Sequence, residues 1–183
     1  MAAESKNLPL GSNIINFNLF NPKLNKFQSL SDLKGDKGTL IIFMCNHCPY
    51  VIHILPKLVE ISKEYVKKGI AFIGINSNDI VKYPEDSPDK MIELAKQYGI
   101  SFPYLYDETQ ETAKLYDAAC TPDFYLYNDQ NHLVYHARFD SSRPNSGVPV
   151  TGEDLLKAMN LVIEGKPIEL PQYNSIGCSI KWK

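Results

Sequence analysis

The stretch Thr39-Leu-Ile-Ile-Phe-Met-Cys45-Asn-His-Cys48-Pro-Tyr50 contains the change of pattern that decides the fold. Residues 39–44 form a continuous apolar run rich in β-branched side chains, which is typical of a strand buried on both faces. From Pro49 the apolar residues recur with helical spacing, and Gly69 suits the end of that helix. Two cysteines and a histidine therefore lie where a buried strand ends and a helix begins.

The rest of the chain predicts alternating strands and helices, followed by a hairpin. We expect strands or extended segments at 70–75, 102–106, 124–127 and 133–139, and helices at 88–98, 109–118 and 151–164, the last capped by Thr151. Alternation over residues 14–30, with a turn at Asn21-Pro22, predicts an N-terminal hairpin. This order predicts an α/β fold with a mixed central sheet flanked by helices, in one domain over residues 1–165 with a tail over 166–183.

Composition limits the possible functions and locations. With 183 residues, 44% of them hydrophobic, the chain is long enough for one sizeable core. A formal charge of −2 argues against a nucleic-acid or anionic-membrane surface. Residues 1–11 lack the apolar core of a secretory signal, and no run approaches a membrane span, so we expect a cytoplasmic location. In that reducing compartment, four cysteines favour catalytic, redox-sensing or metal-binding roles.

Cys48 is the strongest candidate for a reactive thiol. A cysteine at a helix start gains from unpaired N–H groups and the helix dipole, which lower the thiol pKa. Cys45 is the nearest partner thiol, and His47 could add positive charge or carry a proton. Because free cysteine is commonly buried, an inert packing role for each cysteine stays open.

Two prolines carry a resemblance to the thioredoxin superfamily. In thioredoxins a proline lies eight positions after the nucleophilic cysteine, and Pro56 lies eight after Cys48. Pro122, in Cys120-Thr-Pro-Asp123, matches the cis-proline that faces the active site. The resemblance thus places Cys48 as the nucleophile and Val51 in the thioredoxin resolving position.

The wider pattern resembles the peroxiredoxin-like small redoxins, related to alkyl hydroperoxide reductase and thiol-specific antioxidant proteins. It consists of the Cys45–Tyr50 motif, the Cys120–Asp123 motif and the ending Ile176-Gly-Cys-Ser-Ile-Lys-Trp182. Cys45 stands where peroxiredoxins carry a peroxide-binding Thr or Ser, Ile41 replaces their proline, and no arginine is near Cys48 in sequence.

The resemblance implies a thiol-based oxidoreductase that reduces a disulfide or a peroxide. Cys48 attacks the substrate, and Cys45 or Cys120 resolves the product. Thr121, Pro122 and His47 are the implied substrate-binding residues. The resemblance implies no organic cofactor and an external thioredoxin-type reductant. Cys178 lies in the C-terminal tail, and in some peroxiredoxins a tail cysteine resolves the nucleophile of a partner subunit.

Two other functions stay open. Cys45, His47, Cys48 and Cys120 include ligands suited to copper(I) or zinc, and Sco-type copper chaperones share the sequence His47-Cys48-Pro49. Those chaperones carry a second cysteine four residues later, where this chain has Ile52. A non-catalytic protein on a redoxin scaffold is the third reading.

Overall fold

The apolar run after Gly38 forms β4 (Gly38–Phe43), whose six residues are all buried. A computed structural model of the protein describes residues 2–6 and 8–183. β4 pairs in parallel with β5 (Ile70–Asn76) and antiparallel with β8 (Asp123–Asn128). Neighbours on both sides and cover on both faces explain why this strand is apolar throughout.

Four more strands complete a seven-stranded mixed sheet. They are β2 (Asn18–Asn21), β3 (Lys26–Ser29), β6 (Tyr104–Tyr106) and β9 (Leu133–His136). The sheet order is β3-β2-β6-β5-β4-β8-β9. β2 and β3 pair antiparallel across the Asn21-Pro22 turn, so the predicted N-terminal hairpin is confirmed.

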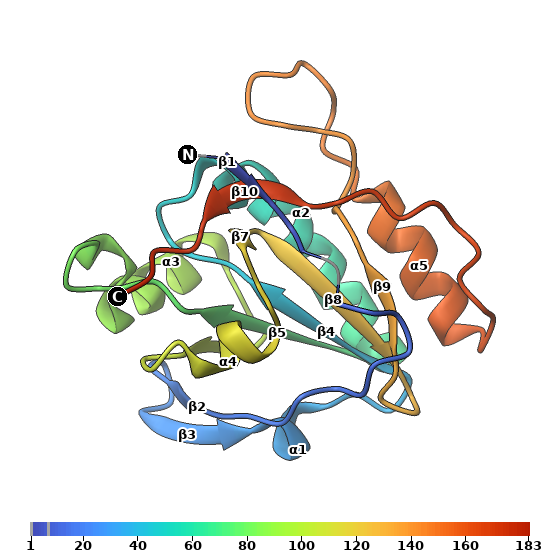
Figure 1. The fold of residues 1–183 in the computed structure, drawn as a ribbon, viewed down its shortest axis with the longest axis horizontal. Coiled ribbons are helices and arrows are strands. Elements are labelled where there is room, and N and C mark those ends of the chain that lie inside the picture. The colour runs from blue at the N-terminus through green and yellow to red at the C-terminus, as the bar shows by residue number, and fades with distance from the viewer. Residues whose placement is uncertain (1, 7) are drawn as a thin grey trace.

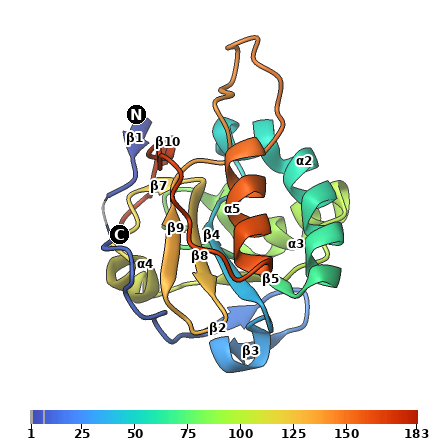
Figure 2. The same cartoon turned by 90° about the vertical axis from the view of Figure 1, so that its right-hand side faces the viewer.

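Helices cover both faces of this sheet (Figures 1 and 2). They are α1 (Leu30–Leu33), α2 (Pro49–Tyr65), α3 (Pro88–Tyr98), α4 (Glu111–Leu115) and α5 (Glu153–Ile163), with 3-10 turns η1 (Val66–Lys68) and η2 (Pro84–Asp86). Alternate β4 side chains enter two cores: Leu40 and Ile42 pack with α2, α3 and α5, whereas Ile41 and Phe43 face α1 and α4.

The final helix begins one residue later than predicted. Gly152, not Thr151, is the N-cap residue of α5, with a φ of +70°. A Cβ at this position would lie 2.7 Å from the Phe139 ring and 2.8 Å from the Ile61 side chain. The left-handed conformation and the close approach together require glycine.

Part of the expected tail folds back onto the domain. Residues Ile176–Ser179 form β10, which pairs antiparallel with β7 (Cys120–Thr121) and with β1 (Ala2–Glu4) in a second, three-stranded sheet. Figure 1 shows this strand in red, close to the start of α2. The sequence analysis assigned no element to β1 or β10, since neither segment has a strand pattern of its own.

None of the helices in the described part of the chain is both long enough and apolar enough to cross a bilayer. The cytoplasmic location stays a prediction.

Candidate active site

Cys48 is the N-cap residue of α2 and is fully buried. Its sulfur lies 3.1 Å from the carbonyl oxygen of Thr121, to which it donates a hydrogen bond while the thiol is neutral. The peptide bond that follows, Thr121-Pro122, is cis, as predicted. The structure therefore brings the predicted nucleophile and the predicted cis-proline loop together across 73 residues of sequence.

Cys45 lies in the same cluster and is also buried. Its sulfur is 3.3 Å from Oγ1 of Thr121. The Cys45 thiol hydrogen-bonds the Cys48 sulfur, and this bond is the largest of the causes that lower the pKa of Cys48 to about 5. Burial opposes the lowering, and the Val51 N–H in the first turn of α2 supports it. The start of α2 thus helps to lower the pKa of Cys48, as expected, but the Cys45 thiol lowers it more.

The proton stays on Cys45. Its pKa is raised well above the ordinary value because it is the donor to Cys48, because it is buried, and because the charge of Asp86 is close. The pair therefore consists of a thiolate on Cys48 and a neutral thiol on Cys45. This is the protonation pattern that a nucleophile and a resolving thiol require.

Cys120 does not join this pair. It is buried, and its thiol donates long bonds to the carbonyl oxygens of Pro122 (3.8 Å) and Ser175 (3.9 Å). Burial, followed by the charge of Asp123, raises its pKa. Its position beside the cis-proline agrees with the prediction, but these contacts give no support to a resolving role.

Cys178, in contrast, lies beside the Cys45–Cys48 pair. In the β10–β7 ladder Cys178 is the residue opposite Thr121. Both its thiol and its backbone N–H hydrogen-bond the Cys48 sulfur and help to lower the pKa of Cys48. From the sequence we considered Cys178 only as a resolving thiol for a partner subunit, because nothing local indicates that the tail returns to its own active site.

His47 points to a carboxylate that the sequence analysis missed. Its Nδ1 lies 2.7 Å from Oδ2 of Asp86, and its ring stacks on Tyr83 with centroids 5.8 Å apart. Asp86 is fully buried and accepts hydrogen bonds from the Asn46 N–H (2.8 Å) and the Asn78 side-chain amide (2.7 Å). Asp86 lies between Pro84 and Pro88 in a polar segment, which has no sequence signal for a residue that supports the site.

A metal ion would have to use a different set of residues from the one expected. In the described residues the group with potential ligand atoms within 4.8 Å of one another is Cys45, His47 and Asp86. Cys48 and Cys120, both in the expected set, are not members of that group. The three donors are types that zinc accepts, with one coordination position left for another ligand.

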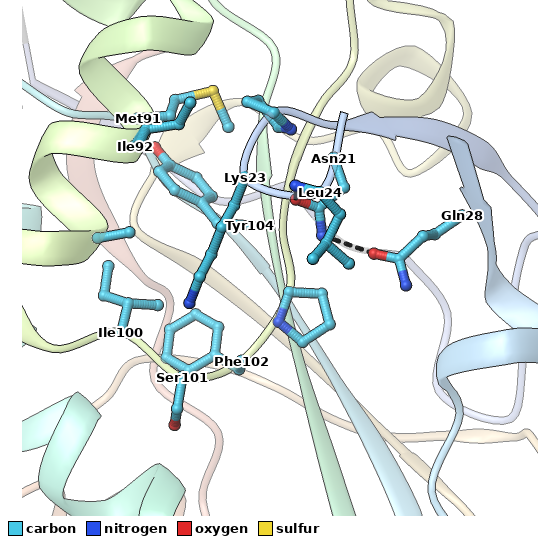
Figure 3. Close-up of a pocket in the computed structure, with 13 residues that line it drawn as sticks. Asn21, Lys23, Leu24, Gln28, Met91, Ile92, Ile100, Ser101, Phe102 and Tyr104 are labelled. Atoms are coloured by element: carbon cyan, nitrogen blue, oxygen red, sulfur yellow. Dashed lines mark hydrogen bonds between the residues drawn. The ribbon is translucent and has the colours of Figure 1, made fainter. Parts of the chain in front are cut away.

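A cavity of about 130 Å³ lies behind the site, between the N-terminal hairpin and α3 (Figure 3). Its walls include Met91, Phe102 and Tyr104, and none of the cysteines lines it. The Tyr104 hydroxyl donates to Oδ1 of Asn46 at 2.9 Å. The cavity therefore lies next to Tyr104, which holds Asn46 in the Cys45–Cys48 loop, and does not contact the reacting sulfurs.

A cysteine at a helix start, packed against a cis-proline that precedes a β-hairpin, defines a thioredoxin-like protein. The structure superposes on the thioredoxin domain of a thiol-disulfide oxidoreductase from Bacteroides vulgatus with a TM-score of 0.66 (16% identity, 86% of this chain, 99% of that one). It also matches an uncharacterized conserved protein from Geobacillus kaustophilus with a TM-score of 0.98 (50% identity, 100% and 97% coverage). The thioredoxin-like mixed α/β fold predicted from the sequence is confirmed.

The chain belongs to the AhpC/TSA family, whose model matches residues 10–136. The family resemblance in the sequence is thereby confirmed. The chain is also 27% identical over 105 residues to thiol-disulfide oxidoreductase ResA of Halalkalibacterium halodurans. That match covers 57% of this chain and 55% of the relative.

Proposed function

We propose that the protein is a thiol-disulfide oxidoreductase with Cys48 as the nucleophile and Cys45 as the resolving thiol. The observation that carries the proposal is the position of Cys48 and Cys45 against the cis Thr121-Pro122 loop, with their sulfurs 3.1 Å and 3.3 Å from oxygens of Thr121. The lowered pKa of Cys48 and the raised pKa of Cys45 support the same assignment. The similarity to ResA, a thiol-disulfide oxidoreductase by name, supports the same reaction class.

The first chemical step is attack of the Cys48 thiolate on one sulfur of a substrate disulfide. The substrate's sulfur–sulfur bond breaks, one substrate thiolate leaves, and a mixed disulfide with Cys48 forms. Cys48 then carries no charge, so its hydrogen bond and its negative charge no longer raise the pKa of Cys45. The proton of Cys45 passes to the departing substrate thiolate.

In the second step Cys45 attacks the Cys48 sulfur. The mixed disulfide breaks, the second substrate thiolate leaves, and a Cys45–Cys48 disulfide remains. Substrate gains two electrons, and a thioredoxin-type dithiol returns two to the protein. Thr121 and Pro122 would lie beside the substrate, and His47 would lie at the edge of the site. We expect this cycle to operate in the cytoplasm, which holds such reductants.

The surroundings of Cys48 favour a disulfide over a peroxide as substrate. Peroxide reduction benefits from a cation beside the thiolate, and the ion pair and hydrogen bonds of the two arginines go to groups other than Cys48. Arg138 pairs with Asp154 at 2.7 Å, and Arg143 donates to the backbone oxygens of Asp140 and Ser142. The Asp140 carboxylate, between the two arginines in sequence, accepts the N–H groups of residues 142, 151 and 152.

Turnover with a protein disulfide tests the proposal. Insulin reduction, driven by dithiothreitol, is followed for the wild type and for Cys48→Ser, Cys45→Ser and Cys120→Ser. We expect Cys48→Ser to abolish the accelerated reduction, Cys45→Ser to impair it, and Cys120→Ser to retain it. Full turnover by Cys48→Ser would refute the proposal, and loss of turnover in Cys120→Ser with an intact fold would return Cys120 to the role of resolving thiol.

A further inference from the structure

Strand β10 brings a third thiol to the reacting pair from the other side of Thr121. The Cys48 sulfur lies 3.1 Å from the Thr121 carbonyl oxygen, and Cys178 is the β10 residue opposite Thr121 in the ladder. β7 is the edge that carries the cis-proline loop, where a substrate segment would be expected to pair. β10 thus occupies that edge with a cysteine of the chain itself at the substrate's position.

The fit of β10 on this edge depends on a glycine. A Cβ on Gly177 would overlap the carbonyl oxygen of Thr121 and would lie 3.0 Å from the nitrogen of Pro122. Hydrogen bonds anchor the strand on both sides: Ser5 N–H to Ser175 O at 3.0 Å before it, and Ile180 N–H to Ala119 O at 3.1 Å after it. The strand is therefore fitted to the cis-proline loop and does not lie over it loosely.

The three thiols of the cluster differ in accessibility. Cys48 is 0% exposed and Cys45 is 1% exposed, whereas Cys178 is only partly buried. Thiol-disulfide exchange requires that the attacking thiolate can reach the disulfide sulfur. Of the three sulfurs, Cys178 is therefore the one that a folded protein dithiol reaches most readily.

We propose that Cys178 is a redox-active relay thiol, which exchanges with Cys48 within one chain and passes the disulfide to the surface where a protein dithiol can reduce it. This proposal rests on the proposed function. In the relay step the Cys178 thiolate attacks the Cys48 sulfur of the Cys45–Cys48 disulfide. The Cys48–Cys178 bond forms, the Cys45–Cys48 bond breaks, and Cys45 leaves as a thiolate that takes the proton released by Cys178.

A protein dithiol of the thioredoxin type completes the cycle. Its first thiolate attacks Cys178, the Cys48–Cys178 bond breaks, and Cys48 leaves as the thiolate that its surroundings stabilise. The second thiol of the reductant then releases Cys178, so two electrons enter and one disulfide leaves with the reductant. In the reduced chain the pKa of Cys178 is raised to about 12 by burial and by its bond to the Cys48 thiolate, and oxidation of Cys48 removes the second cause.

Disulfide mapping of the full-length chain tests the relay. Wild type, Cys45→Ser, Cys178→Ser and the β10 control Ser179→Ala are oxidised with glutathione disulfide, quenched with N-ethylmaleimide, and digested. Cys45 and Cys48 share the tryptic peptide 38–57, whereas Cys178 lies in another, so a cross-linked peptide identifies the relay bond. We expect that cross-link in wild type and Ser179→Ala, as the sole disulfide in Cys45→Ser, and its loss in Cys178→Ser.

Reduction kinetics provide the second measurement. Reduced thioredoxin should reduce oxidised Cys178→Ser much more slowly than oxidised wild type or Ser179→Ala, while small dithiothreitol should reduce all three. Two results would overturn the relay alone. One is a Cys45→Ser chain that accumulates glutathione on Cys48 while Cys178 stays free. The other is an equal rate of reduction by thioredoxin for oxidised wild type and oxidised Cys178→Ser. If Cys48 stays unmodified in every chain, the proposed function fails together with the relay.

Discussion

Replacing Cys45 with alanine should raise the pKa of Cys48, because the Cys45 hydrogen bond is the largest cause of its lowered value. The difference between the ordinary thiol value of 9.0 and about 5 corresponds to roughly 5 kcal/mol in favour of the thiolate. A hydrogen bond to a charged group contributes about 1.5–3 kcal/mol, or about 1–2 pH units. We therefore expect Cys48 in Cys45→Ala to titrate roughly 1–2 pH units higher than in the wild type.

The assay is the thiolate absorbance at 240 nm as a function of pH. The Cys48→Ser chain identifies the transition that belongs to Cys48. The matched variant Cys45→Ser keeps a donor in place of the thiol, so its Cys48 should titrate close to the wild type. Identical titrations of Cys45→Ala and wild type would refute the assignment of the largest effect to Cys45, and so would equal rises in the alanine and serine variants.

Three further predictions concern the support of the site. Asp86→Ala leaves the buried Asn46 N–H and the Asn78 amide without their acceptor, so urea unfolding should show a loss of about 3 kcal/mol, and a loss under about 1 would contradict the structure. Tyr104→Phe removes the donor to Asn46 Oδ1 and should cost about 1–2 kcal/mol in the same assay, with unchanged stability as the contrary result. The Cys48 pKa is lower in the folded chain than in the unfolded chain, so its stabilising contribution is full above pH 9 and disappears as the pH falls through about 5. The free energy of unfolding of wild type relative to Cys48→Ser should therefore rise from pH 5 to pH 8, and a flat difference would contradict the lowered pKa.

The central sheet and its position relative to the cysteines could be predicted from sequence because their signals are local. Residues 40–44, before Cys45, are all apolar, and the apolar residues after Pro49 have helical spacing, so each segment can be assigned from its own pattern. The two prolines then identified Cys48 as the residue at the nucleophile's position. In the structure Pro56 lies inside α2, and Pro122 follows a cis peptide bond, as that alignment requires.

The remaining parts of the site depend on contacts between distant segments. Asp86 supports the loop after Cys45 from a position 40 residues away, and no periodic pattern marks it. β10 forms a strand because β7 and β1 pair with it, and only glycine fits at position 177, where the chain lies against Thr121. Tertiary context of this kind overrides local preference, so the position of Cys178 beside the active-site loop could not be predicted from the sequence.

The central claim is that Cys48 is the sulfur that attacks. It is tested most directly with the double variant Cys45→Ser/Cys178→Ser, in which both thiols bonded to Cys48 are removed and a mixed disulfide should persist. After incubation with glutathione disulfide, mass spectrometry of the digested chain should find one glutathione, on Cys48, and the matching Cys48→Ser chain should acquire none on Cys45. Glutathione on Cys45 in the Cys48→Ser chain, together with an unmodified Cys48 in the double variant, would contradict the account.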